Sequence, residues 1–182
     1  MELLEVLRTR RTTKGFSPAP VSREVLLELA DIARLSPSGG NKNAWRFVIT
    51  TDRAKLDALS TTHPHCRWLT SAQAGIALVA DQSATQYWLE DCCVAAYSIW
   101  LAAVDKGLGV AWAAMYQSRD PQESERRQAF VRDVLSIPGS LNVPMVMGVG
   151  YAQAAPPARV RPSLEDIVRW ERFALYQAKP RS

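Results

Sequence analysis

The chain has 182 residues, of which 47% are hydrophobic and 22% are charged, and its net charge is +4. This composition excludes a disordered or low-complexity chain, and the length suffices for one sizeable core. We therefore expect a single globular domain over residues 1–182. The small positive charge permits an anionic partner but does not predict nucleic-acid binding, because no basic helix accompanies it.

The cysteines do not predict a disulfide framework. The chain has 3 of them, an odd number, and Cys92 and Cys93 are adjacent in a helical segment where successive side chains diverge. The first seven residues predict a short amphipathic helix rather than a secretion leader. The apolar stretch from Cys92 to Val104 is too short to span a bilayer. We expect a cytoplasmic protein with reduced thiols and no membrane contact.

The first candidate binding segment lies near the N-terminus and is basic: Arg8, Arg10, Arg11 and Lys14 surround Thr12. A guanidinium group can bind a phosphate through two parallel hydrogen bonds, and an ammonium or hydroxyl group adds further contacts. The segment is equally consistent with a plain solvated surface, and its residues alone do not decide between the two.

A polar loop follows the next predicted helix, which begins at its N-cap Ser22 and ends near Leu35. Pro37 and two glycines end this helix and expose backbone amides beside uncharged polar side chains, which are Ser38, Asn41 and Asn43. The loop leads directly into a strand predicted over residues 45–51. It is either a simple connection or a binding loop, and its density of hydrogen-bonding groups favours binding.

The segment between the first two strands is expected to contain one short helix, capped by Asp52 and ending near Ser60. Residues 61–73 are expected to be irregular. The two histidines and the cysteine of residues 63–66 suggest a metal site, but a closed zinc site needs four ligands and the chain has no others nearby. We interpret this segment as a polar loop near the site entrance, followed by a short buried strand over residues 75–80.

The longest predicted helix runs from Tyr87 to Lys106 and carries charge only near its ends. Thr85 is its expected N-cap, and Gly107 is the expected residue after its end. Small residues such as Ala95 and Ala102 would let a neighbouring backbone come close on one side, while larger ones such as Tyr97 fill space on another. Because a helix that is apolar all round must be covered on every side, we expect a partner subunit to supply a second layer.

The remaining segments predict a strand or extended loop, then a helix, then a strand. The strand or extended loop begins near Gly107 and Gly109. These two glycines alone do not make the G-x-G-x-x-G fingerprint of a dinucleotide-binding fold. Asp120 caps the helix, which ends before Pro138, and a buried strand covers residues 143–151.

A second basic pair lies near the C-terminus. Arg159 and Arg161 share one side of an extended segment, because side chains alternate along it. Two aligned guanidinium groups can bind an anion, although such a pair is more often plain surface. Ser163 is predicted to cap a last helical turn, and residues 168–173 alternate like an exposed edge strand.

Four of these segments, in this order, resemble the FMN-dependent nitroreductase family over nearly the whole chain. Residues 10–14 resemble its R-R-S-x-R motif, and residues 37–45 resemble its P-S-x-x-N-x-Q-P-W loop. Residues 88–112 are similar to its W-x-x-D motif, central dimer helix and G-L-G-S-x-W segment, and residues 135–161 resemble its distal segment. The departures from these motifs are Thr12, Lys14, Asn43, Ala44 and an alanine, Ala113 or Ala114, for the usual glycine.

The resemblance implies an α+β fold with a mixed central β-sheet flanked by helices. It also implies an intertwined homodimer whose C-terminal segment crosses to the partner, with FMN at the interface. The two basic clusters would hold the phosphate, the polar loop would reach the flavin from the partner subunit, and backbone amides after Trp112 would face its reactive side. The implied cofactor-binding residues are Arg10, Arg11, Thr12, Lys14, Pro37, Ser38, Asn41, Asn43, Ala113, Ala114, Arg159 and Arg161.

The implied activity is transfer of electrons from NADH or NADPH to a flat aromatic acceptor, such as a nitroaromatic or a quinone, by a ping-pong mechanism. The flavin carries the chemistry, so we expect no catalytic side chain and no metal. Lys14, or less favourably Arg67, would stabilise the reduced anionic flavin. Two alternatives remain open: the same flavin used for dehalogenation, flavin cleavage or heterocycle oxidation, and a non-enzymatic basic dimer that binds flavin or nucleic acid.

Overall fold

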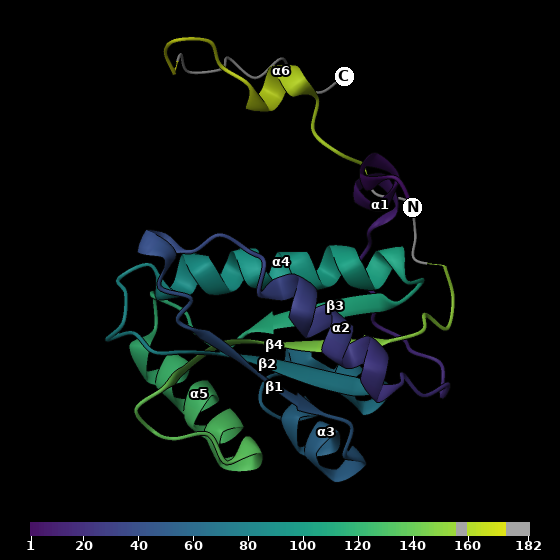
Figure 1. Cartoon of the computed structure of the whole chain (residues 1–182), viewed down its shortest axis with the longest axis vertical. Coiled ribbons are helices and arrows are strands. Elements are labelled where there is room, and N and C mark those ends of the chain that lie inside the picture. The colour runs from purple at the N-terminus through teal and green to yellow at the C-terminus, as the bar shows by residue number, and fades with distance from the viewer. Residues whose placement is uncertain (156–159, 174–182) are drawn as a thin grey trace.

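A four-stranded antiparallel sheet forms the centre of the structure, a computed structural model that describes residues 1–155 and 160–173 (Figure 1). The strand order is β1-β2-β4-β3, with bounds β1 (Trp45–Thr50), β2 (Ala74–Ala80), β3 (Gly109–Ala114) and β4 (Asn142–Gly150). The inner strand β2 is buried along its whole length, whereas β1 and β3 are the two edges. Within the described residues, the only parallel pairing is an isolated bridge between Thr12 and Val110, so the sheet expected to be mixed is antiparallel apart from that contact.

Helices cover both faces of this sheet (Figure 1). Their bounds are α2 (Arg23–Ala33), α3 (Arg53–Ser60), the 3-10 helix η2 (Pro64–Thr70), α4 (Trp88–Asp105) and α5 (Pro121–Leu135). Side chains alternate along β2: Ile76 and Leu78 pack with α2 and α4, and Ala77 and Val79 pack with α3, η2 and α5. The α+β class predicted from the sequence, with a sheet between helices, is confirmed.

Capping side chains begin most helices where the sequence predicts. Ser22, Asp52 and Asp120 each accept a hydrogen bond from a backbone N–H in the first turn of α2, α3 and α5. Thr85 was wrongly expected to cap α4. Its hydroxyl instead accepts a hydrogen bond from the backbone N–H of Tyr87, in the turn that precedes the helix.

The segment expected to be irregular between residues 61 and 73 contains the regular helix η2. The ring of His63 caps it by accepting a hydrogen bond from the backbone N–H of His65 at 3.2 Å. Cys66, Trp68 and Leu69 turn inward and are buried beneath the sheet. The expectation was wrong because a 3-10 helix repeats every three residues, so this inward face does not follow the α-helical spacing.

Large apolar side chains stay exposed on α1 and on the outer face of α4. The small residues of α4 pack inward against the chain's own sheet, while Val94 and Tyr97 on its opposite face are 42% and 44% exposed. The short helix α1 (Leu3–Thr9) buries Val6 but leaves Leu3 exposed. The described part of one chain therefore does not cover α4 on every side. Within the described residues, no helix has the length and apolarity needed to cross a membrane.

The C-terminal segment stands away from the body of the protein (Figure 1). It contains the short helix α6 (Leu164–Ile167), which Ser163 caps together with Asp166 as predicted. Residues 168–173 form no strand, and Trp170 and Phe173 are 86% and 81% exposed. The exposed edge strand expected there is not formed, because residues 170–172 bend and Glu171 has a φ angle of 58°.

Candidate cofactor site

The N-terminal basic segment is anchored at the start of β3. The backbone N–H of Thr13 donates to the carbonyl of Val110 at 2.9 Å, next to the bridge formed by Thr12. The buried Thr13 side chain lies so close to Gly109 that a Cβ atom added there would be 2.7 Å from the Cβ of Thr13. Gly109 is thus required for close backbone approach. This contact fixes the position of the cations on either side of Thr13.

Arg10 and Arg11 have different surroundings although they are adjacent. The guanidinium group of Arg10 lies 4.7 Å from the centre of the Trp100 ring on α4. Arg11 donates from Nη1 to the backbone carbonyls of Arg8 and Arg10, at 2.7 and 2.8 Å. Arg10 is therefore presented on an aromatic surface, whereas Arg11 is bound to its own backbone.

The distal arginine predicted from the sequence also lies at this end of the molecule. Arg161 donates from Nη2 to the carbonyl of Leu7 at 3.4 Å, although the two residues are 154 positions apart. Leu7 belongs to α1, the helix that ends just before Arg10. Arg159, its predicted companion, falls outside the described residues. We name Arg10, Arg11, Lys14 and Arg161 the basic cluster.

Lys14 lines a pocket of about 280 Å³ together with Pro64, His65, Arg67, Trp68, Thr70 and Ser71. None of these residues is acidic, so Lys14 and Arg67 bring positive charge to one small cavity. Burial, followed by the effect of the nearby Arg127 and His65, lowers the pKa of His63 at the start of η2. Within the described residues, no carboxylate forms an ion pair with Arg10, Lys14, Arg67 or Arg161.

The polar loop of residues 37–43 is closed by its own side chains. Ser38 accepts a hydrogen bond from the backbone N–H of Asn43 at 3.0 Å and donates its hydroxyl to the Asn43 side-chain oxygen at 3.1 Å. Gly40, Asn41 and Asn43 have φ angles of 57°, 56° and 49°, in the left-handed region. Pro37, Asn41 and Asn43 are exposed. The loop thus exposes the side chains of Asn41 and Asn43, while the Ser38 hydroxyl is used to close it.

The structure does not bring this loop and the basic cluster together within one chain. The backbone N–H of Gly39 donates to Asp91 Oδ1 at 2.9 Å, which attaches the loop to the first turns of α4. Arg10 lies on Trp100, nine positions further along the same helix. At a rise of about 1.5 Å per residue, the two attachment points are roughly 14 Å apart.

The alanines expected to face the flavin point in different directions. Ala113 is buried in the core cluster that includes α5, whereas Ala114 is exposed. The Val110 carbonyl points away from β4, because it accepts from Thr13, and strand groups alternate in direction. The backbone groups of Trp112 and Ala114 therefore lie on the free edge of β3, and those of Ala113 point toward β4.

Sequence reasoning missed the roles of Trp100 and Asp91 in this site. Both are buried, and within the described residues Trp100 Nε1 and Asp91 Oδ2 have no hydrogen-bond partner. The available signal was the presence of these polar groups in a helix that is otherwise apolar. Such orphaned groups in a native structure call for an explanation.

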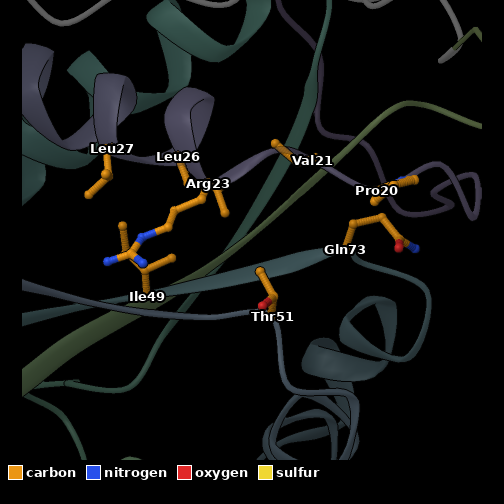
Figure 2. Close-up of a pocket in the computed structure, with 8 residues that line it drawn as sticks. All are labelled: Pro20, Val21, Arg23, Leu26, Leu27, Ile49, Thr51 and Gln73. Atoms are coloured by element: carbon orange, nitrogen blue, oxygen red, sulfur yellow. The ribbon is translucent and has the colours of Figure 1, made fainter.

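Two larger hollows lie beside the edge strand β1, away from the basic cluster. Side chains of α2 point toward those of β1 across a groove of about 550 Å³ (Figure 2). This groove is lined by Pro20, Val21, Arg23, Leu26, Leu27, Ile49, Thr51 and Gln73. An adjoining hollow of about 770 Å³ is lined by Glu24, Leu27, Glu28, Ala30, Asp31, Arg34 and Phe47. Both flank the edge of β1 that carries no partner strand.

Comparison with known proteins identifies the family. The sequence model of the Nitroreductase family matches residues 7–63 and 60–151. The chain is 34% identical over 154 residues to an Archaeoglobus fulgidus protein named "Putative NADH dehydrogenase/NAD(P)H nitroreductase", covering 82% of this chain and 85% of that one. A crystal structure of a protein of the same name from Bacteroides thetaiotaomicron is 27% identical, with a TM-score of 0.86 over 95% of this chain and 99% of that chain.

A third similarity concerns the fold alone. The FMN-dependent nitroreductase from Clostridium difficile R20291 superposes with a TM-score of 0.82 at 24% identity, covering 93% of this chain and 99% of that chain. The arrangement of sheet and helices described above is therefore the nitroreductase fold. With the matches over nearly all of its described residues, the chain belongs to the Nitroreductase family.

Proposed function

We propose that this protein is an FMN-dependent oxidoreductase that takes electrons from NADH or NADPH and passes them to a flat acceptor such as a nitroaromatic or a quinone. The observation that carries this proposal is the basic cluster, in which Arg10 and Arg161 lie near α1 without an ion-pair partner among the described residues. Guanidinium groups whose charge is not neutralised by a carboxylate can bind a phosphate dianion through paired hydrogen bonds. The relatives named NAD(P)H nitroreductases support the electron donor.

The residues present fit FMN. Arg10 lies over Trp100 and keeps N–H groups at its edge for a phosphate, and the exposed Thr12 adds a hydroxyl. Trp100 Nε1 is a buried donor that lacks an acceptor within the described residues. Lys14 and Arg67 place positive charge in one pocket, where they favour negative charge on a bound group. When bound, the flavin would supply the electron transfer, so no side chain need act as catalytic acid or base.

We propose that the functional unit is a homodimer. The loop of residues 37–43 and the basic cluster lie at opposite ends of α4, and Val94 and Tyr97 leave an apolar face of this helix exposed between them. If two copies pair α4 antiparallel across this face, the loop of one subunit reaches the basic cluster of the other. Each cofactor site would then be built from both chains.

The C-terminal segment is proposed to cross to the partner. Residues 160–173 expose Leu164, Trp170 and Phe173, and the groove beside β1 offers apolar side chains and an unpaired strand edge (Figure 2). Among the acidic residues of α2 that line the adjoining hollow, Glu28 and Asp31 are paired with Lys106 and Arg34, which leaves Glu24 to meet the arginines of residues 168–173. All three cysteines are free, in agreement with the reducing cytoplasm that we propose as its location.

We propose a single site used in turn by the nicotinamide and the acceptor, because the chain has no dinucleotide fingerprint. The first measurement is the visible spectrum of the purified protein, which should show bound flavin that NADH or NADPH bleaches under anaerobic conditions. Double-reciprocal plots at several acceptor concentrations should then be parallel. Intersecting lines would exclude the shared site. Bound flavin that neither donor bleaches would favour dehalogenation, flavin cleavage or heterocycle oxidation, and a protein that binds no flavin would overturn the proposal.

A further inference from the structure

Asp91 is a buried carboxylate whose two oxygen atoms have unequal surroundings. The residue is 5% exposed, and its Oδ1 accepts the hydrogen bond from Gly39 in the loop of residues 37–43. Its Oδ2 is buried and has no hydrogen-bond partner within the described part of the chain. Burying a carboxylate with so few partners is costly for folding. The hydrogen bond that Asp91 accepts from Gly39 therefore needs an explanation that offsets this cost.

The loop that Asp91 contacts is held in an uncommon backbone conformation. Asn41 and Asn43 are left-handed, at φ angles of 56° and 49°, a backbone region that non-glycine residues adopt uncommonly. The conformation persists only if neighbouring bonds impose it. The Ser38 side chain closes the loop on itself, and the bond from Gly39 to Asp91 is the contact that fixes the closed loop to α4.

Two further contacts hold this loop and the residue before it along α4 and its N-cap Tyr87. The hydroxyl groups of Ser36 and Ser98 are 2.8 Å apart, and Ser98 lies seven positions after Asp91, on the same side of α4. The ring of Tyr87 lies directly against Gly39, where an added Cβ atom would be 2.8 Å from Tyr87 Cγ and 2.9 Å from Tyr87 Cβ. The backbone of Gly39 thus sits between the Tyr87 ring and the Asp91 carboxylate.

We propose that Asp91 is a positioning residue for the cofactor: it holds the loop of residues 37–43 in its closed conformation, so that the exposed Asn41 is presented to FMN at the neighbouring subunit's basic cluster. The inference rests on the proposed FMN binding and dimer. The helix α4, which is proposed to pair the subunits, then also sets the geometry of the loop through the carboxylate of Asp91. Loss of Asp91 then weakens FMN binding without removing any group that touches FMN.

The first experiment measures the dissociation constant of FMN by quenching of flavin fluorescence, together with the thermal midpoint of the apoprotein. Asp91→Ala should weaken FMN binding about tenfold or more. Asp91→Asn should restore most of the affinity, because its amide oxygen can still accept from Gly39. The matched control is Cys92→Ala, which shortens the next side chain of α4. Burial raises the pKa of Cys92 to about 12, so this control removes a neutral thiol and no charge.

A second variant changes the loop side of the same hydrogen bond between Gly39 and Asp91. Gly39→Ala should also weaken FMN binding, because its Cβ forces the backbone away from Tyr87 and Asp91. Gly139→Ala is its control, since a Cβ atom there meets nothing within 4 Å. If either Asp91→Ala or Gly39→Ala folds and binds FMN within about twofold of wild type, the inference is wrong. A wild-type protein that binds no FMN would instead overturn the proposed function.

Mixed dimers separate positioning from general support of the fold. A dimer of one Asp91→Ala chain and one Arg10→Ala chain should contain one doubly impaired site and one intact site. It should therefore bind half the wild-type amount of FMN at wild-type affinity. If the loop served the site of its own chain, or if Asp91 only stabilised its own subunit, no site of wild-type affinity would form and the inference would fail.

Discussion

Arg10 lies against the Trp100 ring and not against a carboxylate. This arrangement orients a guanidinium group without neutralising it, because the aromatic surface attracts the cation and leaves its N–H edge free. The neighbouring Arg11 has the same charge but is bound to backbone carbonyls. At the scale of single residues, the surroundings of each arginine decide which of them is available to a ligand.

We expect Arg10→Ala to weaken FMN binding by about 1.5–3 kcal/mol, the range for hydrogen bonds to charged groups. Arg161→Ala should have an effect in the same range. Riboflavin, which lacks the phosphate, should bind wild type and both variants with similar affinity. Isothermal titration with the two ligands measures the difference.

The control for this prediction is Lys55→Ala, which removes one positive charge from the exposed surface of α3. It should leave both affinities unchanged. Equal losses for FMN and riboflavin in Arg10→Ala would show that the basic cluster does not bind the phosphate end.

At the scale of elements, α5 illustrates how local charge pairs act on a helix start. Glu123 in its first turn pairs with Arg126 at 2.6 Å and with Arg127 at 2.7 Å. Hydrogen bonds from these two arginines lower the pKa of Glu123 from 4.5 to about 2. The side chain is solvent-accessible, so the pair is a modest contribution to stability.

The sign of the pH dependence follows from this lowered pKa. The stabilisation by Glu123 is fully present above its ordinary pKa of 4.5 and is lost as the pH falls toward the folded-state pKa of about 2. Glu123→Gln should therefore be less stable than wild type in urea unfolding at pH 7, and the difference should shrink between pH 4.5 and pH 2. A difference that stays constant over this range would contradict the assignment.

At the scale of the whole molecule, two features favour the proposed homodimer. One is the exposed apolar face of α4, and the other is the separation of the loop of residues 37–43 from the basic cluster. Ala95 and Ala102, the small residues suggested by sequence for a close helix contact, are buried in the chain's own core. Val94 and Tyr97 are the exposed ones. A substitution at Ala95 would disrupt the fold of the subunit itself. Substitutions at the exposed Val94 and Tyr97 are therefore the proper test of dimer formation.

We expect Val94→Glu and Tyr97→Glu each to produce monomers in sedimentation velocity and to release FMN at the same time. The physical reason is that a charge buried in an apolar interface is costly, and that each site needs the loop of the partner. Lys55→Glu, a charge reversal on the exposed surface of α3, should leave both properties intact. A monomer that retained FMN with wild-type affinity would rule out the shared site.

The sequence by itself determined the elements whose signals are local. Ser22, Asp52, Asp120 and Ser163 cap helices because a side-chain oxygen meets a backbone N–H only two or three residues away, and such a contact needs no distant partner. The buried strand β2 was equally readable, since an inner strand is apolar throughout. Motif order over the chain sufficed for the family and thus for the α+β class, both of which the comparisons confirm.

Only the tertiary structure decided which distant groups meet. Asp91 with Gly39, Arg10 with Trp100, and Arg161 with Leu7 are contacts between segments far apart in the chain, and no spacing rule connects them. The same holds for the inward face of η2 and for the outward face of α4. Local sequence states which groups can donate, accept or pack, but their partners depend on how the sheet and helices bring separate segments together.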